Sequence, residues 1–328
     1  MRLLALGVVL LLAAAALHAA GAFSRDGGKA DRDATAPAVV KSASRLPAPP
    51  PSTAPQAAVG PLPEPAGAAR VDLAQPSLMP YLRLSGPKAG LAFDLADGAV
   101  LWRKRATAVR PIASLTKLMT ALLAVERFGR RERVRIARAA DWVGGSRMAG
   151  LKPGRRVRAD VLLKGLLIAS ANNAAVALAI AGAGSERAWV ALMNRRAKLL
   201  GLRCTHYVDA HGLGARNRSC AADLAALAMR AMNEPRIVEI VGKRYARVWP
   251  GAGRKLTLRT TNQLLRDHYP GVIGLKTGYT SPAGYCLVAI VERGERRVGI
   301  VVLGSRDSFG DVRRVAREAA RAGALPAT

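Results

Sequence analysis

The sequence predicts an α+β (mixed α/β) fold whose antiparallel sheet is built from both ends of the folded region. Two apolar runs at residues 90–95 and 99–103 flank Asp97-Gly98, which is a strong signal for a β-hairpin. The middle of the chain has apolar residues at helical spacing, and three more strand-like runs lie beyond residue 271. Strands at both ends with helices between them favour this layered arrangement.

The helices and the last strands follow from local patterns. Apolar residues recur at helical spacing from Leu115, so a helix is expected to begin near Ser114. Residues 174–181 are apolar on every face and belong in the interior, whereas residues 186–200 are amphipathic and end at Gly201. The remaining expected elements are helices at 160–169, 222–232 and 311–322, and strands at 272–277, 284–291 and 297–303.

The first 83 residues are predicted to be a targeting segment and a tether. Arg2 precedes a run of about fifteen apolar residues and then small residues, which predicts a secretory signal peptide over residues 1–22. The run is shorter than the roughly twenty residues that span a bilayer, so a retained anchor is the alternative. Residues 23–83 are rich in Ala and Pro and predict a disordered linker, followed by a folded domain at 84–323. We therefore expect export to the periplasm.

Charge is the strongest compositional feature, with a formal net charge of +29. Nucleic acid is not the expected partner, because the arginines are scattered and aromatic residues make up only 4% of the chain. For an exported protein, a polyanionic envelope polymer or an anionic lipid surface fits better, including peripheral association with the inner membrane.

The spacing of the cysteines and histidines does not indicate a metal site. Cys204 and Cys220 could pair across a short loop in an oxidising compartment, whereas Cys286 lies in an apolar strand as a buried thiol. His206 and His211 lack the i, i+4 helical spacing of a ligand pair and are interpreted as structural.

Ser114 and Lys117 are the first candidate catalytic residues. The predicted helix places both on one face of its first turn, where unpaired backbone N–H groups favour developing negative charge. A serine hydroxyl becomes a good nucleophile when a neighbouring base takes its proton, and a lysine does this only when burial or nearby positive charge keeps it neutral. By itself, however, a four-residue pattern of this kind arises easily by chance and is more simply explained by a helix-capping serine and a solvated lysine.

Two further motifs strengthen the catalytic interpretation. Ser170 and Asn172 lie at a predicted helix break, where a hydroxyl and an amide can point into a cleft. Lys276-Thr277-Gly278 ends a predicted strand, and its glycine would let a ligand approach the backbone closely. Ser-x-x-Lys, Ser-x-Asn and Lys-Thr-Gly, in this order, are the signature of penicillin-binding proteins and serine β-lactamases.

The chain resembles the low-molecular-weight penicillin-binding proteins over residues 85–310. Within the D-alanyl-D-alanine carboxypeptidase A family, it is most similar to the D-alanyl-D-alanine endopeptidases of the penicillin-binding protein 7 type, especially over residues 280–288. Cys220 departs from the Ser or Thr usual there. The chain also ends soon after its last strands, where carboxypeptidases of the family usually continue into a second β-rich domain and an anchor. The resemblance rests on residues 112–120, 170–178, 201–205, 211–213, 262 and 276–288.

The resemblance implies a fold, a reaction and a role for each motif residue. The fold would be of the serine β-lactamase/transpeptidase type with a helical subdomain. Ser114 would attack a D-alanyl carbonyl in a peptidoglycan stem peptide, Lys117 would accept its proton, Ser170 would relay a proton to the leaving amine, and Asn172 would orient Lys117. Lys276, Thr277, Gly278 and Tyr279 would bind substrate, with the N–H groups of Ser114 and Tyr279 forming the oxyanion hole. No cofactor is required, and β-lactam antibiotics would be covalent inhibitors.

The main prediction is an endopeptidase that cuts peptidoglycan cross-links, and three alternatives remain. A D-alanyl-D-alanine carboxypeptidase that trims stem peptides would share every motif. A β-lactamase of class A would need a deacylating glutamate, and none of the acids between Asn172 and Lys276 has the sequence context for it. A non-catalytic module that binds peptidoglycan or penicillin would not need intact Ser114, Lys117 and Ser170.

Overall fold

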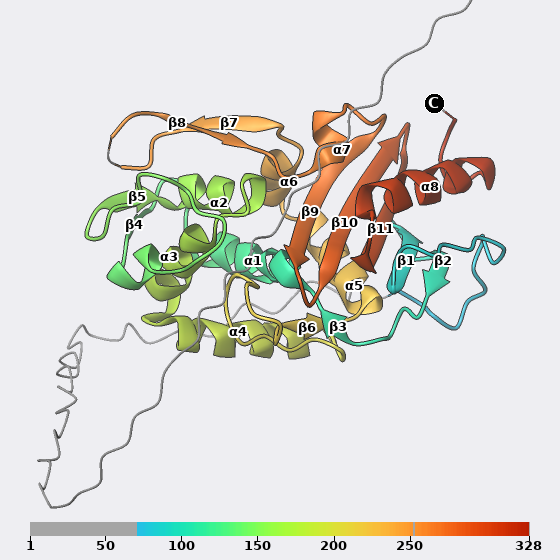
Figure 1. Ribbon diagram of the computed structural model, residues 1–328, viewed down its shortest axis with the longest axis horizontal. Helices are drawn as coiled ribbons and strands as arrows, with labels where there is room; N and C mark the ends of the chain where they lie inside the picture. The colour runs from blue at the N-terminus through green and yellow to red at the C-terminus, as the bar shows by residue number, and fades with distance from the viewer. Residues whose placement is uncertain (1–70, 252, 328) are drawn as a thin grey trace, which may run out of the picture. The chain divides into compact units, whose positions relative to one another are not determined.

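The computed structural model describes residues 71–251 and 253–327 (Figure 1). The predicted signal peptide at 1–22 and the linker up to residue 70 lie outside the described residues. Within the described ranges, no single helix is long and apolar enough to cross a membrane. Two consecutive helices, Asn172–Ala183 and Glu186–Leu199, have the required length and composition together but are bent by 86°.

The elements follow the predicted order, with several short ones added. The strands are β1 Ala89–Asp94, β2 Val100–Lys104, β3 Arg110–Pro111, β4 Arg133–Arg135, β5 Arg156–Arg158, β6 Arg218–Ser219, β7 Tyr245–Val248, β8 Leu256–Arg259, β9 Val272–Thr280, β10 Gly284–Arg293 and β11 Arg296–Ser305. The helices are α1 Lys117–Arg127, α2 Ala159–Ile168, α3 Asn172–Ala183, α4 Glu186–Leu199, α5 Ala221–Met232, α6 Pro235–Val241, α7 Gln263–Arg266 and α8 Ser308–Arg321, with 3₁₀ turns η1 Ala113–Thr116 and η2 Arg138–Asp141.

The main sheet joins the two ends of the folded region, as the sequence predicts. Its order is β2-β1-β11-β10-β9, and every neighbouring pair is antiparallel. The central pairing of β1 with β11 aligns Ala89 with Leu303 and Asp94 with Val298. The predicted α+β architecture is therefore confirmed. β9 is an edge strand of this sheet, so one side of it faces the helices.

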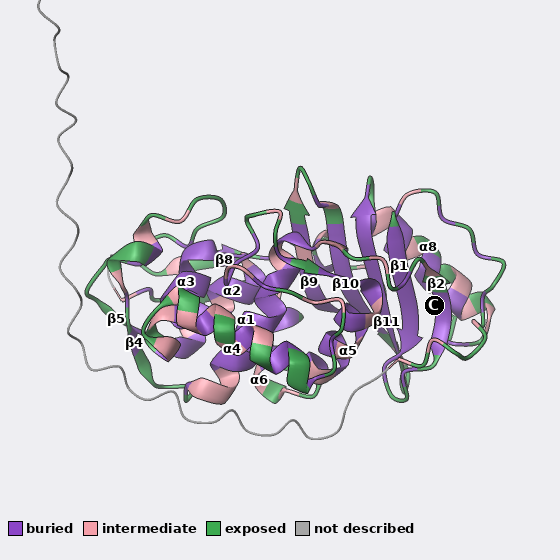
Figure 2. Ribbon diagram, turned by 90° about the horizontal axis from the view of Figure 1, so that it is seen from below, coloured by how far each residue is buried: buried purple, intermediate pink, exposed green. Residues whose placement is uncertain are grey.

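Both faces of the sheet are covered, so its central strands are apolar at successive positions rather than alternately. Figure 1 shows α8 across one face and α5 behind the other, and Figure 2 shows the strands buried. On the α8 face, Val302 belongs to the same buried cluster as Val315. On the opposite face, Val301 belongs to the cluster that includes Leu224 of α5 and Leu118 of α1. Burial on both faces is what makes β10 and β11 continuous apolar runs.

The helical region packs around α3, which is buried along most of its length, as its apolar composition predicts. The predicted break at 170–173 is too long, because α3 already begins at Asn172. Ser170 has a positive φ of 56° and Ala171 is extended, so these two residues complete the turn between α2 and α3. Asn172 therefore lies in the first turn of a helix rather than in a loop.

The sequence did not predict the short hairpins β4–β5 and β7–β8 or the helices α6 and α7, because few residues give each a weak periodic signal. Buried contacts also begin before residue 84: Met79 is fully buried, and the Trp102 indole donates to the Leu82 carbonyl oxygen at 3.0 Å.

Candidate active site

Ser114 lies on a short 3₁₀ turn, η1, that leads directly into α1. Ala113, just before it, has a positive φ of 47°, an unfavourable conformation for a residue with a side chain. The Thr116 hydroxyl closes the turn by donating to the Ala113 carbonyl oxygen at 2.8 Å. Gly212 packs beneath it so closely that a Cβ there would lie 2.0 Å from the same oxygen. Surrounding contacts thus hold Ser114 in a strained turn.

Lys117 is fully buried, and its side-chain nitrogen contacts three oxygen atoms. Nζ lies 2.9 Å from Ser114 Oγ and 2.7 Å from Asn172 Oδ1, and it also donates to the His211 carbonyl oxygen. Burial, reinforced by the positive charge of Lys276, holds the pKa of Lys117 well below its usual range, although Asp209 acts in the opposite direction. The structure therefore brings the predicted Ser-x-x-Lys pair into direct contact and favours a neutral amine.

Asn172 links Lys117 to the loop that follows η2. Its amide nitrogen donates to the Gly144 carbonyl oxygen at 2.7 Å, and its backbone N–H donates to the Ser146 carbonyl oxygen at 2.7 Å. With the amide nitrogen hydrogen-bonded to Gly144, the carbonyl oxygen is the end of the Asn172 amide that faces Lys117. This arrangement fixes the orientation of the side chain.

Ser170 and Lys276 form a second pair across from the first. Lys276 Nζ lies 2.9 Å from Ser170 Oγ and donates to the Thr277 carbonyl oxygen at 2.8 Å. Burial lowers the pKa of Lys276 to about 7, because a charged ammonium group is poorly solvated there. The three sequence motifs therefore converge, as their order in the chain suggested, although they come from η1, the α2–α3 turn and β9.

The edge strand β9 passes close to Ser114. A Cβ added at Gly278 would lie 3.0 Å from the Ser114 backbone nitrogen, so a side chain here would crowd the Ser114 backbone. Thr277 Oγ1 lies 2.6 Å from Thr261 Oγ1, and Tyr279 is 56% exposed, with its ring centroid 4.6 Å from that of Tyr285. The exposed end of β9 thus faces solvent beside the nucleophile candidate.

Two polar residues that support the site, Asp209 and Asn217, were not predicted from the sequence. Asn217 is fully buried and donates to Thr116 Oγ1 at 3.0 Å and to Asp209 Oδ1 at 2.9 Å. Asp209 Oδ1 in turn accepts from the backbone N–H groups of His211 and Gly212. These contacts hold the loop whose His211 carbonyl oxygen meets Lys117. Only the Asp-Ala-His-Gly turn signal at 209–212 could have suggested this role.

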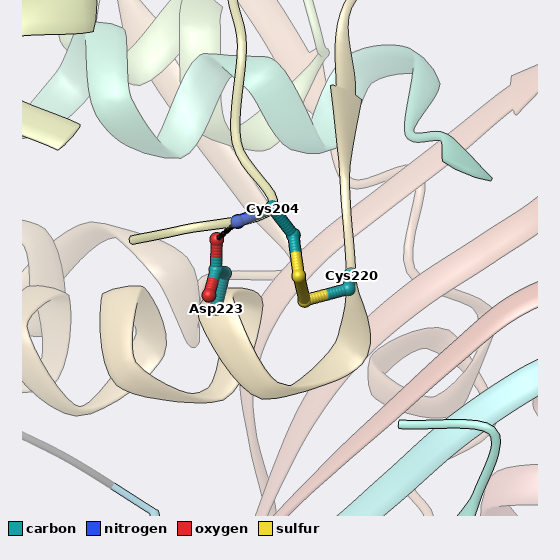
Figure 3. Close-up of side chains that lie close together, drawn as sticks. All are labelled: Cys204, Cys220 and Asp223. Carbon is teal, nitrogen blue, oxygen red and sulfur yellow. Dashed lines mark hydrogen bonds between the residues drawn. A yellow bond between two sulfur atoms is a disulfide. The ribbon is translucent and has the colours of Figure 1, made fainter. Parts of the chain in front are cut away.

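A disulfide closes that loop at its base. Cys204 and Cys220 are bonded, with 16 residues of sequence separation, which confirms the predicted pairing (Figure 3). Asp223 accepts from the Cys204 backbone N–H at 2.7 Å and from the Thr205 hydroxyl at 2.7 Å. Cys204, Cys220 and Asp223 form a group of potential metal ligands, but the two sulfur atoms are bonded to each other. Cys286 is a buried free thiol whose pKa burial raises to about 11.

The histidines have structural surroundings. His206 pairs with Arg218 in an isolated β-bridge, and the His211 ring accepts from the Leu213 backbone N–H at 3.1 Å. Burial lowers the pKa of His211 despite the nearby Asp209 and Glu186 carboxylates. The His211 ring is thus neutral near pH 7, and its carbonyl oxygen is the group that contacts Lys117.

A serine hydroxyl against a buried amine, beside a strand edge and a second Ser–Lys pair, is suited to acyl transfer. Comparison with known proteins agrees with this chemistry. The family model described as D-alanyl-D-alanine carboxypeptidase matches residues 86–307, which is more than half of the chain.

Individual relatives carry two different names. The D-alanyl-D-alanine carboxypeptidase DacF of Bacillus subtilis is 36% identical over 224 residues, covering 66% of this chain and 57% of that protein. The D-alanyl-D-alanine endopeptidase of Haemophilus influenzae is 32% identical over 216 residues, covering 65% of this chain and 73% of that protein. The chain thus matches less than two thirds of the length of DacF.

A solved structure gives the same picture for the fold. Penicillin-binding protein D2 from Listeria monocytogenes, in its ampicillin-bound form, superposes with a TM-score of 0.64 at 31% identity, covering 73% of this chain and 98% of that one. The family match, the identities and the shared fold agree, and the chain belongs to the D-alanyl-D-alanine carboxypeptidase family.

Proposed function

We propose that this chain is a serine-type D-alanyl-D-alanine peptidase that hydrolyses D-alanyl bonds in peptidoglycan through an acyl-enzyme. The observation that carries the proposal is the contact between the buried Lys117 amine and the Ser114 hydroxyl, 2.9 Å apart. A pKa held low by burial supplies the base that an unactivated serine lacks.

The hydrogen bonds around Lys117 indicate the direction of proton transfer. A neutral amine has two N–H groups and one lone pair. Asn172 Oδ1 and the His211 carbonyl oxygen can only accept, so they use both N–H groups. The lone pair then remains for Ser114, whose hydroxyl donates to it. The site thus favours the hydrogen-bond direction in which the Ser114 hydroxyl proton already points toward the Lys117 nitrogen.

In the proposed reaction, Ser114 Oγ forms a bond to the D-alanyl carbonyl carbon while its proton passes to Lys117. The backbone N–H groups of Ser114 and Tyr279 stabilise the oxyanion of the tetrahedral intermediate. The C–N bond then breaks, and Ser170 relays a proton to the leaving amine. Water hydrolyses the resulting ester and regenerates the Ser114 hydroxyl. These steps use only side chains, backbone and water.

Substrate is proposed to lie along β9. The Lys276 ammonium group and the Thr277 hydroxyl would bind a substrate carboxylate, and Gly278 would allow the extended peptide to approach the strand edge. Asn172 would orient Lys117 and the substrate amide. Lys276 has a second role in this scheme, because its contact with Ser170 Oγ at 2.9 Å orients the proton relay.

We favour endopeptidase action on cross-links, since residues 280–288 are most similar to the endopeptidase branch and an endopeptidase is among the relatives. Carboxypeptidase action is the second candidate, supported by the DacF match. Digestion of purified peptidoglycan with mass analysis of the products separates them. Loss of cross-linked dimers indicates an endopeptidase, whereas loss of terminal D-alanine from monomers indicates a carboxypeptidase.

The acyl-enzyme itself is tested with a fluorescent penicillin, because β-lactams are proposed to acylate Ser114. We expect Ser114→Ala to abolish covalent labelling while the protein stays folded. Labelling of that variant would show that another residue is the nucleophile. Rapid release of hydrolysed penicillin by the wild type would instead indicate a β-lactamase, and labelling without turnover of any D-alanyl peptide would indicate a non-catalytic binding module.

The proposed place of action is the periplasm, reached through the predicted signal peptide at 1–22. The predicted linker would let the domain reach the wall polymer, and the net charge of +29 supports association with anionic surfaces, including the inner membrane. Fractionation of cells that express the full chain tests this location.

A further inference from the structure

A second concave site lies apart from Ser114, on the helical side of the molecule. It is a cavity of about 340 Å³ between β4–β5, α2 and the end of β7, and none of its lining residues belongs to the Ser114 site. Its polar lining is dominated by cations, with one exposed aromatic ring. The cationic and aromatic residues are Arg133, Arg156, Arg158, Lys164, Arg247 and Trp249.

The β4–β5 hairpin carries arginines directly opposite one another. Its register pairs Arg133 with Arg158 and Arg135 with Arg156, while Val134 and Val157 are buried on the other face. Like charges in directly opposed positions destabilise a β-ribbon. The fold therefore accepts an electrostatic cost here, which a bound anion would offset.

The acids of this region do not neutralise these arginines. Asp160 is the acidic residue in the lining, and it pairs instead with Lys164 at 3.2 Å and with Arg236 at 3.8 Å. Within the described part of the chain, the lining guanidinium groups have no hydrogen bond or ion pair. These groups are Arg133, Arg156, Arg158 and Arg247. The cavity consequently has several fork-shaped donors free for a ligand.

Trp249 adds a planar apolar surface to the charges. Its indole is 50% exposed, yet it is held by a hydrogen bond from Nε1 to the Gly253 carbonyl oxygen at 3.3 Å. The adjoining turn packs against β5, because a Cβ added at Gly251 would lie 3.0 Å from Val157 Cγ2. The Trp249 ring therefore lines the same cavity as the arginines of β4 and β5. An exposed ring next to free guanidinium groups suits a ligand with one apolar face and one anionic group.

We infer that this cavity binds an acidic saccharide, a sugar unit that carries a carboxylate or a phosphate group. The ring of Trp249 packs against the C–H face of the sugar, and the paired arginines bind the anion through two-pronged hydrogen bonds. A concave site of about 340 Å³ favours an inserted group over a flat lipid surface, so membrane binding is an outcome of the test rather than the proposal.

The position of the cavity relative to Ser170 gives such binding a use. α2 carries Asp160 in its first turn beside the cavity, and Ser170 follows its last turn. A ten-residue helix is about 15 Å long, so one polymer could occupy both places at once. Only this last step rests on the proposed function, because saccharide binding in the cavity does not require a working Ser114.

The direct test is calorimetric titration of the full chain at about 150 mM salt, which screens long-range fields. The probes are tri-galacturonate, a phosphorylated trisaccharide and neutral chitotriose. We expect at least one acidic probe to bind and the neutral one to fail. Arg133→Gln/Arg158→Gln should weaken acidic binding at least about tenfold, as expected for charge-assisted hydrogen bonds. Its melting temperature should stay unchanged or rise, because a repulsive pair is removed.

Three variants distinguish specific binding in the cavity from nonspecific attraction to the positive charge of the protein. Arg187→Gln/Arg195→Gln removes the same charge from exposed positions of α4 and should bind like the wild type. Arg133→Lys/Arg158→Lys keeps the charge but loses the paired hydrogen bonds of the guanidinium groups. This variant should therefore bind the acidic probe more weakly than the wild type. Trp249→Ala should weaken trisaccharide binding while leaving inorganic phosphate binding unchanged.

Several results would overturn the inference: equal binding of neutral and acidic probes, wild-type affinity in Arg133→Gln/Arg158→Gln, or equal loss in the α4 control. Binding confined to vesicles of phosphatidylglycerol would assign the arginines to a membrane surface instead. A Ser114→Ala protein that still binds the acidic probe, together with a wild type that cuts no D-alanyl bond, would reject the proposed function and leave this inference standing.

Discussion

Lys117 and Lys276 are both fully buried, both have a lowered pKa, and both contact a serine hydroxyl at 2.9 Å, yet their surroundings differ. Lys117 stands on a helix and meets two further oxygens that accept only, from Asn172 and His211. Lys276 stands on an edge strand and has one such oxygen, from Thr277. The number of obligatory acceptors, rather than burial, distinguishes the two sites.

That difference assigns different chemistry to the same residue type. At Lys117 both N–H groups of a neutral amine are engaged, so its lone pair is directed at one hydroxyl. At Lys276 the pKa lies at about 7, so an appreciable fraction carries a charge that can bind an anion at neutral pH. One lysine is thus suited to accept a proton and the other to hold a carboxylate. Their charges also oppose each other, since Lys276 lowers the pKa of Lys117.

The largest effect is expected from arginine in place of Lys117. A guanidinium group stays protonated at any working pH, so Lys117→Arg should reduce acylation by a fluorescent penicillin about as much as Lys117→Ala, on the order of 10²–10⁴-fold. Stopped-flow labelling measures the rate, and circular dichroism checks the fold. A Lys117→Arg protein with much of the wild-type rate would mean that this lysine acts by charge alone. The proposed difference between Lys117 and Lys276 would then be wrong.

The same exchange at Lys276 should be milder. Lys276→Arg retains a cation and should keep much more activity than Lys276→Ala, whose acylation we expect to fall on the order of 10–10²-fold through the lost charge-assisted hydrogen bond. Because Lys276 is buried, its contact with the proposed substrate carboxylate would be screened little by salt, so the Lys276→Ala defect should persist across a salt series on a small D-alanyl peptide. A defect that disappears in high salt would remove Lys276 from the substrate site.

The pH dependence of kcat/KM should also distinguish the two lysines, although the expected change is smaller. Lys276 loses its proton as pH rises through about 7, so kcat/KM for a carboxylate-bearing peptide should fall on the alkaline side, roughly eightfold between pH 6.5 and pH 8. On the acid side, kcat/KM falls as Lys117 becomes protonated. Lys276→Arg should remove the alkaline limb only, because arginine stays charged. An unchanged alkaline limb in that variant would assign it to another group.

Removal of the disulfide tests whether the loop between Cys204 and Cys220 supports Lys117 and not Lys276. Replacing Cys204 and Cys220 together by Ala should lower the free energy of unfolding by about 3 kcal/mol, from the closure entropy of a loop of about sixteen residues. We expect acylation to slow a few-fold, since that loop carries His211 and Asn217. Peptide KM, which reports on Lys276, should stay unchanged. Cys286→Ala is the matched control, and an equal rate loss there would exclude a specific effect of the loop.

Much of the fold and the site could be predicted from local chemistry. The Asp97-Gly98 turn, the apolar run of α3 and the final strands have signals that depend on neighbours in the chain, and the sheet was correctly expected from both ends. The short hairpins were missed for the opposite reason. Three-residue strands such as β4 and β5 have almost no periodicity, and only their pairing with each other and the burial of Val134 and Val157 in the core define them.

By itself, the sequence determined which residue types the chemistry needs, because Ser-x-x-Lys, Ser-x-Asn and Lys-Thr-Gly are each contained in four residues or fewer. Tertiary structure decided what each lysine can do. The pKa of a side chain depends on the solvent and charges around it, and the residues that set these for Lys117, including Asn172, Asp209 and Lys276, lie 55, 92 and 159 positions further along the chain. No local pattern records such contacts, since folding alone brings these groups together.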